Sequence, residues 1–90
     1  MQCEADVTII NALGLHARAA AKLVALASRY ESEVLVVRDD KRVNAKSIMG
    51  VMMLAAAQGT ELKLVINGDD AEAAMVAIQG LIENRFGEEQ

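Results

Sequence analysis

Residues 5–29, ADVTIINALGLHARAAAKLVALASR, contain the change of pattern that decides the fold. Up to residue 9, apolar and polar residues alternate, which is typical of a half-buried strand. The alternation breaks in the segment NALGL at residues 11–15, which contains Gly14. Over residues 17–29 the apolar positions 20, 23, 24 and 27 follow the spacing of an amphipathic helix. A strand therefore passes through a short loop into a helix.

The remaining sequence predicts three more strands and two more helices. The strands are expected at residues 33–38, 42–45 and 61–67, from an aliphatic run, a preceding Asp-Asp-Lys turn and an apolar alternation. The helices are expected at residues 47–54 and from residue 71 until Gly87 ends the second one, with an Asp of the preceding Gly-Asp-Asp turn as its cap. The order βαββαβα predicts one α+β domain over residues 1–90, with helices on one face of an antiparallel sheet.

Composition excludes several classes of function. The net charge of −4 and the aromatic content of 2% disfavour nucleic-acid binding, which needs clustered cations and stacking platforms. No apolar run is long enough to cross a bilayer, and the acidic N-terminus differs from a signal peptide. The single cysteine, Cys3, forms no internal disulfide, and no metal-ligand spacing is present. We therefore expect a cytoplasmic protein without metal or other cofactor.

His16, the only histidine, lies where the first loop becomes the first helix. The first N–H groups of a helix lack intrahelical partners and stabilise an anion such as phosphate. The same dipole favours a neutral imidazole with a free lone pair, and Arg18 can place a cation nearby. These groups suit a phosphoryl-accepting site. The alternative is that His16 only caps the helix and Arg18 is a solvated charge.

The segment at residues 47–54 is apolar nearly all round, so part of Ile48, Met49 and Met52 or Met53 should stay at the surface. Exposed methionines adapt to partner shapes, but methionine also fills gaps in small cores, and both interpretations stay open. Ser47 is expected to be the N-cap and is also a candidate phosphorylation site. The acidic pairs at residues 39–40, 69–70 and 88–89 are interpreted as turns and a solvated tail.

Two motifs resemble a known family. The segment NALGLHAR at residues 11–18, followed by an Ala-rich helix, resembles the active-site segment of HPr, the phosphocarrier of the bacterial phosphotransferase system. The segment KSIMGVM at residues 46–52 resembles its regulatory-serine helix. The resemblance covers roughly residues 4–87. It implies an HPr-like open-faced β-sandwich, with four antiparallel strands under three helices.

The resemblance also implies a function. His16 would accept a phosphoryl group on Nδ1 from enzyme I, itself charged by phosphoenolpyruvate, and pass it to an enzyme IIA-type component. Arg18 would neutralise the phosphate, and partners would dock on the apolar residues Leu15, Ile48, Met49 and Met52. Such a monomeric carrier is a substrate of other enzymes rather than a turnover enzyme. A small acyl phosphatase that binds phosphate through Arg18 is a weaker alternative.

Regulation and pathway stay open at this point. Ser47 matches the position that an HPr kinase/phosphorylase modifies in the branches that possess one. Ala19 stands where many family members have Pro, which is similar to the nitrogen-related paralogues. The tail with Phe86, Gly87 and Glu88 favours the same branch. The alternative to a carrier in sugar uptake is therefore a nitrogen-related regulatory phosphorelay, whose phosphorylation state controls partner binding.

Overall fold

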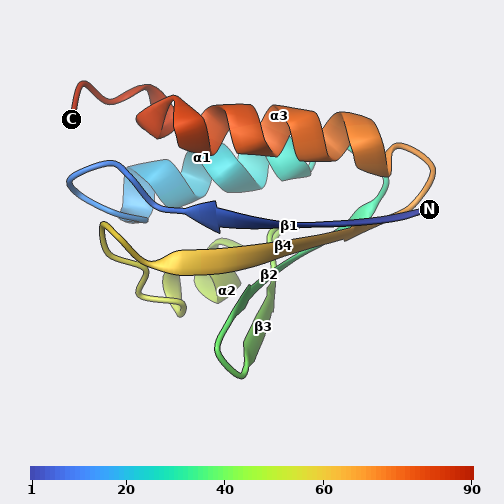
Figure 1. Ribbon diagram of the computed structural model, residues 1–90, viewed down its shortest axis with the longest axis horizontal. Helices are drawn as coiled ribbons and strands as arrows, with labels where there is room; N and C mark the ends of the chain where they lie inside the picture. Colours follow the sequence, from blue (N-terminus) through green and yellow to red (C-terminus); the bar gives the residue numbers. More distant parts are fainter.

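Four antiparallel strands form a single sheet with three helices on one of its faces (Figure 1). The computed structural model describes residues 1–90. The strands are β1 (Gln2–Thr8), β2 (Glu33–Arg38), β3 (Lys41–Asn44) and β4 (Glu61–Asn67). The helices are α1 (Ala17–Ala27), α2 (Ile48–Met52) and α3 (Ala71–Glu83), and a 3₁₀ turn follows at Arg85–Gly87. The predicted order βαββαβα is confirmed.

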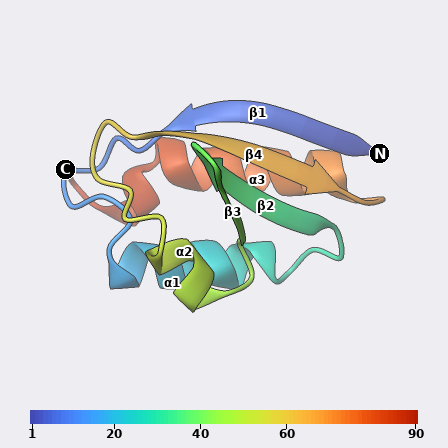
Figure 2. The same ribbon diagram turned by 90° about the horizontal axis from the view of Figure 1, so that it is seen from below.

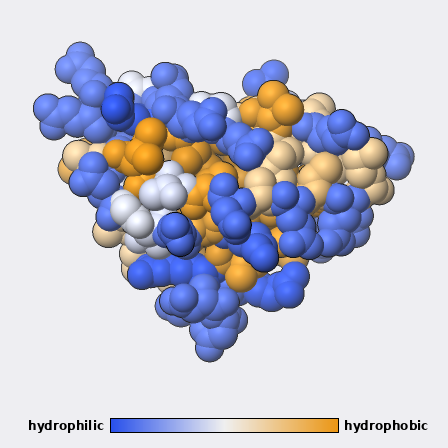
Figure 3. All heavy atoms as spheres, in the orientation of Figure 1, coloured by the Kyte–Doolittle hydropathy of each residue, from blue (hydrophilic) through white to orange (hydrophobic).

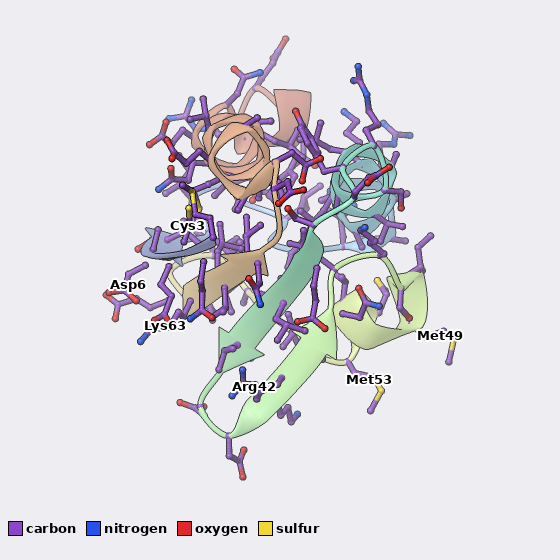
Figure 4. The ribbon with its side chains drawn as sticks, turned by 90° about the vertical axis from the view of Figure 1, so that its right-hand side faces the viewer. Cys3, Asp6, Arg42, Met49, Met53 and Lys63 are labelled. Carbon is purple, nitrogen blue, oxygen red and sulfur yellow. The ribbon has the colours of Figure 1, made fainter.

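The sheet has the strand order β1-β4-β2-β3, so β4 lies between β1 and β2. Leu64 of β4 pairs with Ala5 on one side and with Val36 on the other. Because side chains alternate along a strand, Leu62, Leu64 and Ile66 face the helices and are buried, whereas Lys63 is exposed. Figure 4 shows the open face, toward which Arg42 and Lys63 point.

The hydrophobic core fills the space between the sheet and the helices. The small residues Ala19, Ala20 and Ala27 of α1 are fully buried, and this helix lies close to α2 and α3. Helix α2 lies beside α1 near β3 (Figure 2). Cys3 lies half-buried on the edge strand β1, where its side chain packs against the core. None of the helices combines the length and the apolar character needed to cross a membrane.

Helix α2 is shorter than its sequence pattern predicts, with five residues rather than eight. Arg38 explains the difference, because its guanidinium donates hydrogen bonds to the carbonyls of Leu54 at 2.6 Å and Ala55 at 3.0 Å. These carbonyls no longer need helical partners. Ala55 then adopts a left-handed conformation with φ of 50°, which turns the chain away from the helix.

The acidic turn supplies the N-cap residue of α3, as predicted, but the side chain of this residue has a different role. Asp70 occupies the N-cap position but makes no capping hydrogen bond. Its carboxylate instead accepts hydrogen bonds from the backbone N–H groups of Glu31 at 2.9 Å and Ser32 at 3.0 Å. The acidic turn at residues 69–70 is therefore more than a solvated turn, because Asp70 joins the β4–α3 connection to the α1–β2 connection.

Candidate functional site

His16 lies at the N-terminus of α1, as predicted. It is the N-cap residue, in an extended conformation, and its carbonyl accepts the first helical hydrogen bond from the N–H of Ala20 at 2.8 Å. Its side chain makes no capping hydrogen bond, so His16 holds the N-cap position through its backbone alone and its imidazole is free of that role. The imidazole is 29% exposed, which leaves it accessible to a partner at the positive end of the helix dipole.

Gly14 sets the position of the loop that carries His16. Its φ of +68° is a left-handed conformation, and a Cβ there would lie 2.7 Å from the carbonyl oxygen of Ala56. Next to it, the N–H of Leu15 donates a hydrogen bond to the same oxygen at 2.8 Å. Only glycine permits this close approach. The loop before α1 is therefore joined to the segment that follows α2.

Arg18 lies in the first turn of α1 and is exposed. No hydrogen bond or ion pair joins it to His16 or to any other side chain. Its guanidinium therefore has no competing protein partner at the end of the helix where the N–H groups are free. This arrangement leaves Arg18 available to an anion.

Glu88 is the site residue that the sequence analysis missed. Its Oε2 contacts Nε2 of His16, and its Oε1 accepts a hydrogen bond from Nδ2 of Asn11 at 2.9 Å. The hydrogen bonds from His16 and, second, from Asn11 hold the pKa of the Glu88 carboxyl below its ordinary value. The prediction of a solvated tail is wrong for Glu88. A local sequence pattern cannot predict this contact, because 72 positions separate His16 from Glu88.

The tail that brings Glu88 to His16 is anchored at two further points. Phe86 is fully buried, and its carbonyl accepts a hydrogen bond from Nζ of Lys22 at 2.6 Å. The carbonyl of Gln90 accepts one from the N–H of Ala12 at 3.0 Å. Figures 1 and 2 both show the C-terminus beside the loop between β1 and α1. The tail is thus part of the site.

The exposed face of α2 and the residue after it form an apolar area, which we name the α2 patch. Its members are Ile48, Met49, Met52 and Met53, of which Met49 is 75% exposed. Figure 4 shows Met49 and Met53 pointing away from the protein. The prediction that this helix exposes methionines is confirmed. Figure 3 shows hydrophilic residues over the tip of the β2–β3 hairpin.

Leu15 requires a correction, because we expected it on the same apolar surface. Its side chain is only 6% exposed and belongs to the core cluster. The hydrogen bond from its N–H to Ala56 turns this residue inward, while Leu13 on the other side of Gly14 is 71% exposed. Leu15 therefore anchors the β1–α1 loop to the hydrophobic core and does not belong to the exposed apolar surface.

Ser47 is the N-cap of α2, as predicted. Its Oγ accepts a hydrogen bond from the N–H of Gly50 at 3.1 Å. The neighbouring Lys46 is held by a hydrogen bond from Nζ to the carbonyl of Tyr30 at 2.7 Å. Ser47 is half-buried at the border of the α2 patch. A change at its hydroxyl would therefore act on the start of this helix.

Comparison with known proteins identifies relatives along nearly the whole chain. The family model described as "PTS HPr component phosphorylation site" matches residues 3–84. The chain is 57% identical to the phosphocarrier protein HPr of Cupriavidus necator, over 92% of this chain and 93% of that protein. It is 45% identical to the phosphocarrier protein NPr of Shewanella violacea, over 94% and 93% of the two chains.

Solved structures agree with this result. A crystal structure of HPr from Thermoanaerobacter tengcongensis, 50% identical, superposes with a TM-score of 0.94 over 98% of this chain and 99% of that chain. The predicted open-faced arrangement of four strands and three helices is therefore confirmed. A second structure of the protein from that organism, described as an HPr dimer, is 51% identical and covers 91% of this chain and 94% of that chain, with a TM-score of 0.78.

Proposed function

This chain belongs to the HPr family, the phosphocarriers of the phosphotransferase system, and we propose that His16 is the residue that carries the phosphoryl group. The observation that supports this role is the position of the imidazole, which is 29% exposed at the N-terminus of α1. Free N–H groups and the helix dipole stabilise the charge of a phosphoryl group there. Nδ1 of His16 has no hydrogen-bond partner, which leaves it as the accepting nitrogen.

In this proposal the phosphoryl group comes from enzyme I, charged by phosphoenolpyruvate, and goes on to enzyme IIA-type components. The protein contributes position and charge rather than covalent chemistry of its own. Arg18 lies free on the first turn of α1 and balances the phosphoryl charge during arrival and departure. Phosphoenolpyruvate-dependent transfer of this kind belongs in the cytoplasm, and no cofactor is required.

The α2 patch is the proposed docking surface, with Ile48, Met49 and Met52 at its centre. A carrier must bind and leave its donor and its acceptor in turn, so a small apolar area with a polar rim suits it better than a large interface. Methionine side chains adapt to partners of different shape. The protein would then act as a monomer, because a second copy on this surface would compete with enzyme I.

The acceptor defines the biological branch. The HPr of Cupriavidus necator is more similar to this chain than the NPr of Shewanella violacea, which favours sugar uptake. Ala19, in place of the proline of many family members, favours the nitrogen-related relay instead. Competition between a sugar-specific and a nitrogen-related IIA protein for the phosphorylated chain would decide the branch, since the physiological acceptor should receive the group much faster.

The test of the carrier function is incubation with enzyme I and phosphoenolpyruvate, followed by intact-protein mass spectrometry. Wild type should gain one phosphoryl group that is lost in acid, and His16→Ala should gain none while its circular dichroism stays that of a folded chain. Arg18→Ala is expected to load and unload more slowly. Acid-labile phosphate on His16→Ala would contradict the proposal.

Ser47 offers a second level of control through an HPr kinase/phosphorylase. Its hydroxyl lies at the start of α2, so a phosphate would place a dianion beside the docking surface. Repulsion by an acidic partner surface would then slow loading of His16. Chain phosphorylated on Ser47 should be loaded by enzyme I more slowly than unmodified chain, and equal rates would refute this control.

A further inference from the structure

The carboxylate of Glu88 joins two donors that come from the opposite end of the sequence. Oε2 contacts Nε2 of His16, and Oε1 accepts the hydrogen bond from Asn11 at 2.9 Å. Asn11 is itself fully buried and also donates to the carbonyl of Gly14 at 2.8 Å. The buried side chain of Asn11 therefore holds the carboxylate of Glu88 in place, and this carboxylate in turn orients the imidazole of His16.

The fold delivers Glu88 to this position independently of His16. Phe86 is buried in the core, and Lys22 of α1 holds its carbonyl at 2.6 Å. Beyond Glu88, the carbonyl of Gln90 is held by the N–H of Ala12. The contact with His16 is thus the middle one of three points at which the tail is fastened to the β1–α1 loop and α1.

An ionised carboxylate can only accept hydrogen bonds, so the nitrogen that faces it must carry a proton. Nε2 of the neutral imidazole is therefore the protonated nitrogen, and Nδ1 keeps its lone pair. We propose that Glu88 is a positioning residue for phosphoryl transfer, which holds the ring of His16 in the tautomer whose Nδ1 is the nucleophile. This inference rests on the proposed role of His16 as the phosphoryl acceptor.

The transfer step then balances without any further proton movement on this chain. The lone pair of Nδ1 forms the bond to phosphorus, the bond from phosphorus to the donor atom of enzyme I breaks, and its electron pair stays with the donor. Nε2 keeps its proton throughout, so the phosphorylated ring becomes a cation and Glu88 is its counter-charge. A ring that keeps this proton is also the better leaving group when the phosphoryl group moves on.

The charges around the carboxylate support an ionised Glu88. Hydrogen bonds from His16 and Asn11 lower the pKa of this carboxyl most, and the positive charge of Lys22 lowers it further. The groups that face it are thus Lys22 from α1, His16 at the N-cap of this helix, and Asn11 from the preceding loop. Glu89, its neighbour in the tail, is exposed and makes no hydrogen bond, so it provides a matched control.

The test uses the full chain as wild type, Glu88→Ala, Glu88→Gln and Glu89→Gln. Two-bond ¹⁵N–¹H spectra of His16 near neutral pH should show the Nε2–H tautomer in wild type and Glu89→Gln, and a mixture of tautomers in Glu88→Ala. Phosphoryl transfer from enzyme I should lose about tenfold in kcat in Glu88→Ala with little change in KM, which is the lower end of the loss seen when a metal-ligating histidine loses the carboxylate that orients it.

Glu88→Gln keeps the size of the side chain and removes its charge, so it separates loss of charge from loss of fold. Its kcat should also fall, while its thermal midpoint stays close to that of Glu89→Gln. Normal loading of wild type together with unchanged tautomer and kcat in Glu88→Ala would overturn the inference alone. Failure of enzyme I to load wild type would overturn the proposed function and this inference with it.

Discussion

Asp70 and Ser32, 38 positions apart, are joined by two hydrogen bonds to one carboxylate oxygen. The backbone N–H of Ser32 donates to Oδ1 of Asp70 at 3.0 Å, and the hydroxyl of the same serine donates to the same oxygen. Ser32 is buried, so its hydroxyl has no alternative partner in water. The pair joins the α1–β2 and β4–α3 connections, which lie at the end of the sheet away from the β1–α1 loop (Figure 1).

Acid should therefore destabilise the protein through Asp70. The hydrogen bond from the Ser32 side chain, followed by that from the Glu31 backbone, lowers the pKa of this carboxyl in the folded state. A carboxyl with a depressed folded pKa stabilises the fold above its unfolded pKa, and this contribution is lost as pH falls through the folded pKa. Asp70→Asn should lower the thermal midpoint at pH 7 and flatten its decline below about pH 4. Asp69→Asn, at an exposed neighbour, should keep the wild-type profile, and identical profiles for both variants would contradict this account.

Gly14→Ala should destabilise the protein by about 2–3 kcal/mol, because it combines a strained backbone with a steric clash. The new Cβ would lie 2.7 Å from a backbone oxygen that cannot move without disturbing the loop after α2. Gly80→Ala is the control, since a Cβ added there would have nothing within 4 Å and the residue is helical. It should stabilise the protein by about 0.5–1 kcal/mol. Urea unfolding measures both, and equal effects of the two substitutions would refute the steric explanation.

Phe86→Ala should cost about 3–5 kcal/mol, as expected for a fully buried aromatic residue. Phe86→Leu should cost about 1 kcal/mol, because it fills most of the same volume. The position is near the C-terminus, where a loss of this size is unexpected for a frayed tail. Urea unfolding at neutral pH is the measurement, and a loss below about 1 kcal/mol for Phe86→Ala would show that the tail is not part of the core.

Met49→Glu should impair docking without impairing the fold. Met49 is 75% exposed, so its replacement should change stability by no more than about 0.5 kcal/mol. KM for loading by enzyme I should rise about tenfold, equivalent to about 1.4 kcal/mol of binding free energy. Val76→Glu is a matched control, because Val76 is 72% exposed but lies on α3, away from α2. Equal KM values for the two variants would exclude the α2 patch as the docking surface.

The sequence predicts the elements of this fold well because each has a strong local period. Leu62, Leu64 and Ile66 alternate as expected of a strand with one buried face, and they are buried in the structure. The end of α2 differs from the predicted one because it depends on Arg38, which lies 16 residues before its acceptor Leu54. Periodicity contains no information about such a contact.

The candidate site was predicted in part for the same reason. His16 follows from the break at Gly14 and the helix after it, which are local signals. Glu88 does not, because its role arises only when the tail returns to the β1–α1 loop. The burial of Leu15 does not follow from the sequence either, because a sequence pattern does not reveal which side of a loop faces the core.

The close approach of Gly14 to Ala56 fastens the loop of His16 to the chain that leaves α2. The imidazole and the α2 patch are therefore held at one fixed offset, as two parts of a single template. In the proposed transfer, a partner with a surface complementary to this template would meet Nδ1 of His16 without a further search. New acceptors can thus arise by copying one recognition surface, while the carrier itself stays unchanged.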